Sequence, residues 1–362
     1  MRVERLWLTD FRNYESADLS PAPGLTVVVG DNGEGKTNLL EAVGYLATLA
    51  SFRGAPRDAL VREGRDHAVV RAEIDRAPES RRSTIEAELA LAGRDRVLVN
   101  RQPLRRARDL LGALRVVVFS PDDLALVKGG PAERRRYLDD TMVAVDPRLD
   151  AVRDEFERVL RQRNALLRQA AGAGGRLAGD LATTLEVWDE RLASAGERLG
   201  VARADLCGRL EPLVAKRYAQ VAGNGAHVGL VYDAPWREPG LSAALVSARA
   251  DELRRGISLV GPHRDEIALS VDGLPARTHA SQGEQRSLAL ALRLGAHALV
   301  TDVIGVAPVL LLDDIFSELD ADRSAALVAH LPDAQALLAT TVGVPAGARA
   351  DLVVRVSGGR IA

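Results

Sequence analysis

The sequence predicts an α/β fold, a mixed sheet with flanking helices, that carries an inserted and mainly helical lobe. Three observations predict it. A glycine-rich turn at residues 30–37 lies between an apolar run and a segment with helical periodicity. Near the other end of the chain, an apolar run closes on two carboxylates, Asp313 and Asp314. Between these two regions, residues 149–213 place apolar side chains three and four apart, which is helical spacing. Strands and helices alternate at both ends of the chain, so one sheet is expected to combine distant segments.

The glycine-rich turn matches the pattern G-x-x-x-x-G-K-T at every position. Its residues are Gly30, Asp31, Asn32, Gly33, Glu34, Gly35, Lys36 and Thr37. Glycine lets the backbone turn tightly, so that N–H groups point at phosphate oxygens, and the following helix adds the positive end of its dipole. Lys36 is then placed to reach the β- and γ-phosphates of a nucleotide, and the Thr37 hydroxyl to hold Mg²⁺. We therefore expect a nucleotide cradle formed by all eight residues.

Lysine usage argues against a chance glycine turn. The chain has 48 basic residues, of which only Lys36, Lys128 and Lys216 are lysines. A chain that uses arginine almost everywhere has lysine at the one position where a compact ammonium is needed.

Composition excludes several classes of protein. The formal net charge is −2, so any nucleic-acid surface must be a local patch. One cysteine, Cys207, excludes an intrachain disulfide, and a small buried residue is its ordinary interpretation. No signal-peptide region and no window of 18 uncharged apolar residues is apparent, so we expect no membrane span and a cytoplasmic location.

The first 115 residues predict a mixed α/β region with antiparallel strands. Strands are expected at residues 3–8, 25–29, 68–74, 84–91 and 97–100, with turns at 11–14 and 76–83 and an arginine-rich loop with a short helix at 51–65. A further strand at 115–119 ends at Ser120, which can cap a helix that has Pro121 in its first turn.

The middle of the chain predicts the inserted lobe. Two long helices, residues 149–169 and about 185–213, flank a glycine-rich break and predict an antiparallel arm whose spacing only Arg163 interrupts. Beyond the arm we expect a helix at 241–256, a short strand and polar turn at 258–266, and a strand at 267–271. The predicted domains are a first lobe of residues 1–115 plus 257–362 and a second lobe of residues 116–256.

A second group of candidate site residues lies near the end of the chain. Ser281, Gln282 and Gly283 open an apolar helix, and Ser281 with Glu284 forms an S-x-x-E capping box. A capped helix N-terminus can bind an anion, although an ordinary cap is the alternative. Asp313 ends a buried strand and is suited to hold Mg²⁺ beside Thr37, whereas Asp314 is suited to orient an attacking water as general base. Lys36, Asp313 and Asp314 are therefore the candidate catalytic residues.

Basic residues gather locally. Between residues 101 and 137, nine Arg or Lys residues accompany four Asp or Glu residues. The run at 134–136 is either a solvated helix face or a contact for DNA or nucleotide. His263 and Arg264 likewise either contact DNA or anchor a turn.

Together these elements are similar to the ATP-binding-cassette ATPase heads of chromosome-maintenance and DNA-repair proteins. Within that class the chain resembles the RecF family over nearly its full length. The residues that carry the resemblance are 11–14, 51–53, 120–124, 128–129, 134–136, 261–265, 312–314 and 317–320.

The resemblance implies ATP and Mg²⁺ as cofactors and an ATP-dependent homodimer. In that dimer Ser281 and Gln282 of one subunit cover the γ-phosphate held by the other, and Arg12 and Asn13 lie near the base or ribose. The resemblance also implies binding to double-stranded DNA next to single-stranded gaps, slow ATP hydrolysis, and cooperation with RecR and RecO in placing the recombinase RecA during DNA repair and the SOS response.

The sequence departs from the wider cassette pattern. The usual L-S-G-G-Q reads Ser-Gln-Gly-Glu-Gln at 281–285, and an aspartate, Asp314, stands where a longer glutamate is usual. No histidine follows the expected strand 336–340, where Thr340 and Thr341 lie, and no Q-loop glutamine is identified, although the turn at 120–123 lies in the right part of the chain. These departures predict slow turnover. The alternatives are an ATP-switched binding module with negligible hydrolysis and the energy-coupling subunit of a transporter, which would carry the histidine and lack the arm.

Overall fold

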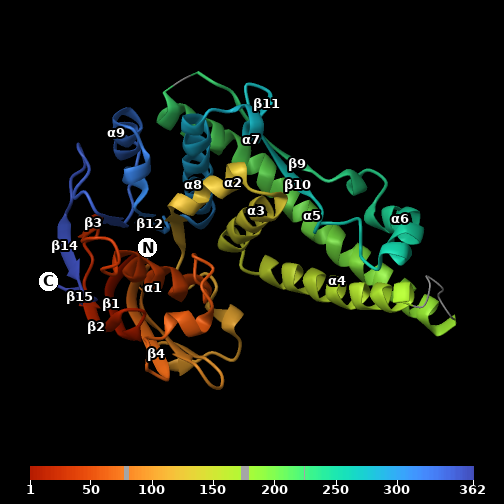
Figure 1. Ribbon diagram of the computed structural model, residues 1–362, viewed down its shortest axis with the longest axis horizontal. Coiled ribbons are helices and arrows are strands. Elements are labelled where there is room, and N and C mark those ends of the chain that lie inside the picture. Colours follow the sequence, from red (N-terminus) through yellow and green to blue (C-terminus); the bar gives the residue numbers. More distant parts are fainter. Residues whose placement is uncertain (77–80, 173–178, 224) are drawn as a thin grey trace. The chain divides into compact units, whose positions relative to one another are not determined.

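The computed structural model covers the chain and describes residues 1–76, 81–172, 179–223 and 225–362 (Figure 1). The chain forms two compact units. Unit 1 comprises Met1–Leu124, Leu213–Ala226 and Ala280–Ala362, and unit 2 comprises Ala125–Pro212 and His227–His279.

Unit 1 contains two six-stranded sheets. The antiparallel sheet has the order β2 (Tyr14–Leu19), β1 (Arg2–Phe11), β4 (His67–Arg76), β5 (Arg81–Ala90), β6 (Arg96–Val99), β7 (Gln102–Pro103). The second sheet has the order β15 (Arg360–Ile361), β14 (Leu352–Ser357), β3 (Leu25–Val29), β13 (Ala336–Thr340), β12 (Val309–Asp313), β8 (Val116–Phe119). Its strands β14, β3, β13, β12 and β8 are parallel, and β15 is antiparallel. The predicted α/β class is thereby confirmed.

Helices cover both faces of the parallel sheet, as the continuous apolar runs of its strands require. Helix α1 (Lys36–Thr48) packs into one core with the antiparallel sheet and with Val309 and Leu311 of β12. The opposite face, including Leu310 and Leu312, packs against α8 (Gln282–Ile304) and α9 (Ala321–Ala329). Alternate residues of one strand thus belong to two different cores.

Helix α8 is long and apolar enough to meet the length and composition of a membrane span, although its sequence includes charged residues. In this structure 67% of its most apolar window is buried. That burial is what the core helix of a globular unit requires, because α8 covers one face of the parallel sheet.

Unit 2 is mainly helical. Its elements are α2 (Leu124–Lys128), which starts at the last residue of unit 1, α3 (Pro131–Val145), α4 (Leu149–Gly172), most of α5 (Gly179–Ala222), α6 (Leu241–Arg255), α7 (Ala276–His279), η4 (Pro235–Arg237) and the antiparallel strands β9 (Val228–Asp233), β10 (Glu266–Val271) and β11 (Leu274–Pro275). The ion pairs Arg163–Asp189 and Arg198–Glu155 run in opposite directions along α4 and α5. The two helices are therefore antiparallel, as predicted for the arm; the glycine-rich break between them lies mostly outside the described residues.

The interruption of the arm's apolar pattern has a structural reason. Arg163 is fully buried and donates to Asp189, Glu252 and Ser258 at 2.6–2.7 Å. It is a core residue of unit 2, although its charge breaks the apolar pattern. Cys207 is buried as well, and burial raises the pKa of its thiol to about 12.

Several boundaries differ from the sequence expectation. Residues 116–124 lie in unit 1, because β8 pairs with β12, and residues 213–226 lie there as well. Residues 257–279 lie in unit 2, because β10 pairs with β9. The strand expected within 258–266 is absent, since the described backbone there forms turns, and β2 and α9 were not predicted.

Candidate nucleotide-binding site

The predicted site residues gather where the parallel strands of unit 1 end. The carboxyl ends of β8, β12, β13 and β3 lie side by side in register. The residues at or directly after these ends are Ser120, Asp313, Thr340 and Gly30. Open α/β sheets bind ligands outside the carboxyl ends of their strands, so the topology marks this edge as a site.

Glycines shape the loop at residues 30–37. Gly35 caps α1 with φ 118°, and a Cβ there would come within 2.8 Å of the Asn13 amide. A Cβ on Gly30 would lie 2.4 Å from the Val356 carbonyl oxygen. Side chains at these two positions would therefore force the loop away from its neighbours, and Gly33, with φ 86°, adds a left-handed turn.

The loop is joined directly to the strand that ends in two aspartates. The Thr37 hydroxyl donates to Asp313 Oδ1 at 2.7 Å, although the two residues are 276 positions apart. Lys36 is 6% exposed, and its ammonium donates to the Asp31 carbonyl at 2.7 Å inside the loop. Burial raises the pKa of Asp313, as does the charge of Asp314, whereas the Thr37 hydrogen bond, Arg53 and Lys36 lower it. A hydroxyl and a carboxylate, both hard oxygen donors, thus lie together at the loop.

Asp314 has an unusual backbone and an unpartnered oxygen. Its φ of 48° lies in the left-handed region, and its N–H donates to the Ala339 carbonyl at 2.9 Å. Its carboxylate Oδ1 is buried and has no hydrogen-bond partner. Strained backbone and unsatisfied buried polar atoms concentrate at functional sites, so this carboxylate is a candidate for contact with a reacting group.

Residues before the loop hold it from one side. Asn13 Nδ2 donates to the Glu34 carbonyl at 2.9 Å, and the buried Tyr14 hydroxyl donates to the Gly35 carbonyl at 3.0 Å. Arg12 forms a two-pronged ion pair with Glu41 of α1, at 2.7 and 2.8 Å. Sequence reasoning missed Glu41, which is fully buried; a lone glutamate within an apolar helix face was the available signal.

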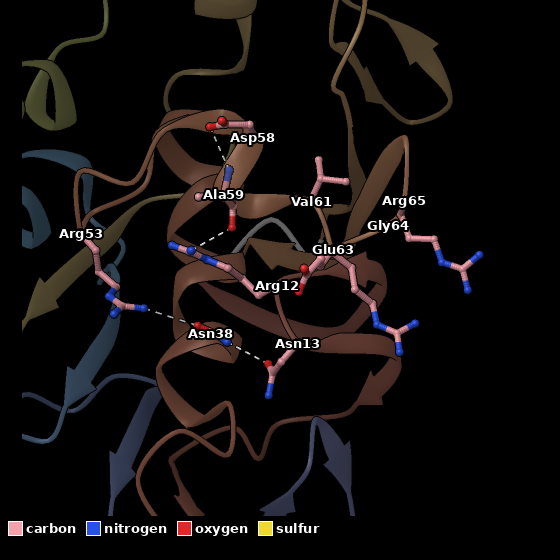
Figure 2. Close-up of a pocket in the computed structure, with 11 residues that line it drawn as sticks. Arg12, Asn13, Asn38, Arg53, Asp58, Ala59, Val61, Glu63, Gly64 and Arg65 are labelled. Carbon is pink, nitrogen blue, oxygen red and sulfur yellow. Dashed lines mark hydrogen bonds between the residues drawn. The ribbon is translucent and has the colours of Figure 1, made fainter.

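Arg12 and Asn13 also line a cavity of about 1080 Å³ (Figure 2). Asn38, Arg53 and residues from the segment 58–65, which overlaps η1 (Arg57–Leu60), complete its lining. Dashed lines in Figure 2 join Arg53 to Asn38 and Asn38 to Asn13. The cavity therefore begins next to Thr37 and is rich in arginine and amide groups.

The segment at 281–285 forms the predicted helix start. The Ser281 side chain accepts from the Glu284 N–H, while the Ser281 N–H donates to the Glu284 carboxylate at 2.7 Å. A Cβ on Gly283 would lie 2.6 Å from Arg323 Nη2, so a larger residue there would displace that guanidinium. Arg323 in turn donates to Ser287 at 3.0 Å and pairs with Asp320, the cap of α9.

The turn after β8 takes a related form. Ser120 and Asp123 make a capping box with Pro121 at the first position, and the expected helix begins there as the 3-10 turn η3 (Pro121–Asp123), which continues directly into α2. Asp123 accepts from Arg293 of α8 at 2.6 Å. The turn thus lies at the site edge and is tied to the helix that begins at Gln282.

Two segments whose role the sequence left open make contacts within unit 2. In the run 134–136, Arg134 is buried and paired with Glu266, Arg135 donates to the Asp265 carbonyl, and the exposed Arg136 pairs with Glu133. His263 and Arg264 both contact the Ser258 carbonyl, at 3.1 and 3.2 Å. Arg134, Arg135 and His263 therefore anchor unit 2 internally, whereas Arg136 and Arg264 are exposed, and a contact of either segment with DNA stays a hypothesis.

This fold and loop define an ATP-binding-cassette ATPase head. The family model described as the RecF/RecN/SMC N terminal domain matches residues 2–357. The chain belongs to the RecF family of DNA replication and repair proteins. It is 47% identical to the DNA replication and repair protein RecF of Frankia alni, over 99% of this chain and 97% of that one, and 46% identical to that of Streptomyces avermitilis, over 96% and 97%.

Solved structures agree. The recombination mediator protein RecF-ATPrS in the RecFOR pathway is 27% identical, with a TM-score of 0.91 over 99% of this chain and 97% of that one. An Smc head bound to the C-winged helix domain of ScpA, 16% identical, has a TM-score of 0.60 over 100% of this chain and 96% of that one, and shows the shared fold. The predicted cassette-head fold is confirmed.

Proposed function

We propose that the chain is an ATP-dependent DNA-binding clamp that acts in recombinational repair of gapped DNA. ATP binding drives dimerisation, the dimer binds duplex DNA beside a single-stranded gap, and it helps load a recombinase together with RecO and RecR in the cytoplasm. The hydrogen bond between Thr37 and Asp313 carries this proposal, because it joins the phosphate loop to the strand-end carboxylates. Relatives solved as RecF-ATP and RecF-ATPrS support ATP as the nucleotide.

Thr37 and Asp313 would hold Mg²⁺. Their oxygens fit this hard cation, which takes few protein ligands and completes its shell with phosphates and water. Accordingly, the site needs no cluster of three or more ligating side chains, and the described residues form none. When bound, Mg²⁺ supplies charge neutralisation at the β- and γ-phosphates.

Asp314 acts as the general base for a slow hydrolysis. Its buried Oδ1 has no protein partner and can accept a proton from a water. An aspartate reaches one methylene less far than glutamate, so turnover is slow and the ATP state persists. Ser281, Gln282 and Gly283 act in trans, where the capped N-terminus of α8 faces the γ-phosphate on the other subunit.

A mixing experiment tests the trans arrangement. Lys36→Ala removes the phosphate contact, and Ser281→Arg blocks the helix N-terminus, so each variant alone should lose ATP hydrolysis. In a dimer of the two, one site combines an intact loop with an intact α8. Equal mixing should restore about a quarter of the wild-type rate, because half of the dimers are mixed and each has one good site. Ser242→Arg, at an exposed position of α6, is the matched control and should stay active by itself. Recovery that never exceeds the sum of the separate variants would overturn the trans site.

A single-turnover measurement separates a slow ATPase from an ATP-switched binding module. Asp314→Asn should slow hydrolysis on the order of 10²–10⁴-fold while the ATP-dependent dimer, followed by light scattering, persists. Equal rates for both proteins would mean that Asp314 is not the base, and negligible hydrolysis by the wild-type protein would favour the binding module. A protein that stays monomeric with ATP and Mg²⁺ would exclude the clamp.

A further inference from the structure

Most arginines that the structure describes form ion pairs or hydrogen bonds within the protein. Among those that the sequence marked as basic excess, Arg134 and Arg135 are internal and Arg136 is ion-paired. Arg115 donates to the Gly112 carbonyl at 3.0 Å, and burial lowers the pKa of its guanidinium. These four arginines therefore already have partners within the protein.

One segment of unit 1 differs from these regions, because its arginines are all exposed. Residues 94–106, the basic hairpin, contain β6, β7 and the chain that follows them. Its arginines are Arg94, Arg96, Arg101, Arg105 and Arg106. All five are exposed, and among the residues that the structure describes none of them forms an ion pair with a carboxylate. The one acidic residue of the hairpin, Asp95, is bound elsewhere, since it accepts from Arg57 at 3.0 Å and from the Ala90 N–H at 3.1 Å.

The backbone of the basic hairpin is held in a defined shape. Asn100 and Arg101 form its tip with φ of 52° and 64°, between the paired residues Val99 and Gln102. Two successive positive φ angles are those of a tight hairpin turn. Asn100 bonds to Thr84 twice, through its N–H at 2.8 Å and its side-chain oxygen at 2.9 Å. An arginine thus occupies a strained and exposed position where glycine is favoured.

The spacing of the charges suits a duplex. Strand β6 rises about 3.3 Å per residue from Arg96 to Val99, and the chain turns back at Asn100 and Arg101, so Arg96 and Arg101 are separated by roughly 13 Å along the hairpin. That length matches about four base-pair steps at 3.4 Å each. Guanidinium groups bind phosphates in two-pronged fashion, and a hairpin with unpaired arginines attracts polyanions without reading sequence.

We propose that the basic hairpin, residues 94–106, contacts the phosphodiester backbone of duplex DNA. The inference rests on the proposed DNA clamp and assigns its phosphate contacts to these five arginines. Arg57 links this surface to the nucleotide site, because it pairs with Asp95 and directly precedes Asp58, which lines the cavity beside Asn38. The antiparallel sheet that bears the hairpin is drawn in red to orange in Figure 1.

The test compares two triple variants in duplex binding with ATP and Mg²⁺. Arg101→Ser, Arg105→Ser and Arg106→Ser remove three charges of the hairpin. The control, Arg136→Ser, Arg161→Ser and Arg254→Ser, removes three exposed arginines that pair with neighbouring carboxylates on helices. Binding of a labelled 30-base-pair duplex is measured at several salt concentrations, together with ATP-dependent dimerisation.

The hairpin variant should bind duplex at least about tenfold more weakly, and the slope of log K against log salt should fall by roughly 2–3, about 0.9 per lost phosphate contact. Dimerisation should remain, and the control should keep the wild-type slope. Wild-type affinity and slope in the hairpin variant would overturn this inference alone. A wild-type protein that dimerises with ATP but binds no duplex would overturn the proposed DNA clamp as well.

Discussion

Two groups of arginines in this chain have the same side chain and opposite surroundings. In unit 2, Arg163 and Arg203 are buried, and each binds carboxylates and neutral oxygens at 2.6–2.8 Å. In unit 1, the arginines of the basic hairpin are exposed and have no carboxylate partner among the described residues. The first group satisfies its charge inside the protein, whereas the second leaves it available to a ligand. The number of arginines in a segment therefore says little about nucleic-acid binding until the partners are known.

Removing a buried arginine should have the largest effect on stability. Arg163→Met leaves Glu252, which is also fully buried, without its ion partner, so the free energy of unfolding should fall by about 3–5 kcal/mol. Urea denaturation measures it. The matched control on the same helix is Arg161→Met, whose exposed pair with Glu157 at 3.8 Å should contribute under about 0.5 kcal/mol. Similar losses for both variants would contradict the distinction between the two groups.

The buried side chain of His297 differs from the buried arginines, because it should make the free energy of unfolding depend on pH. His297 is 2% exposed, and burial, with the nearby charge of Arg217, lowers its pKa to about 4, although it donates to the Pro308 carbonyl at 3.1 Å. Between pH 6.5 and 4 the unfolded chain binds a proton that the folded chain does not, so stability is full above pH 6.5 and falls below it. The loss should reach roughly 2 kcal/mol by pH 5.

Unfolding in urea at pH 7.0, 6.0 and 5.0 measures the slope of the free energy of unfolding against pH. His297→Gln should reduce this slope by about half, because burial lowers the pKa of His263 to about 4 as well and His263 contributes a similar slope. His279→Gln, at an exposed position, should leave the slope in place. An unchanged slope in His297→Gln would show that other groups cause the pH dependence.

The run at 134–136 allows a buried arginine and an exposed arginine to be compared within three consecutive residues. Arg134→Lys loses a two-pronged pair with Glu266 at 2.7 and 2.8 Å and two bonds to backbone carbonyls, at a cost of about 1–2 kcal/mol. Arg136→Lys keeps a charge beside Glu133 and should stay within about 0.5 kcal/mol of wild type. Thermal unfolding compares the stability of the two variants. Equal stability would mean that the two-pronged pair of Arg134 with Glu266 does not stabilise the protein more than a lysine would.

These cases show which parts of the molecule local sequence determines. The loop at 30–37 could be predicted because its chemistry requires particular residues at fixed spacing. The capping boxes at Ser120 and Ser281 are equally local. Partners of buried charges are not local, since Arg163 and Glu252 are 89 positions apart. The predicted boundary at residue 257 was wrong for the same reason, because β10 belongs to unit 2 through its pairing with β9, about forty positions earlier.

The smallest expected effect on stability separates folding from binding most cleanly. Arg101→Gly gives the hairpin tip the sequence Asn-Gly, which suits two successive positive φ angles. Relief of the left-handed strain is partly offset by the greater freedom of glycine in the unfolded chain, so stability should rise by between 0 and about 1 kcal/mol. The same change should lower the salt slope of duplex binding by about 1. A variant that is at least as stable yet binds DNA more weakly cannot be explained by damaged folding. If Arg101→Gly instead loses stability, the strained tip is required for the fold, and its arginine is structural like those of unit 2.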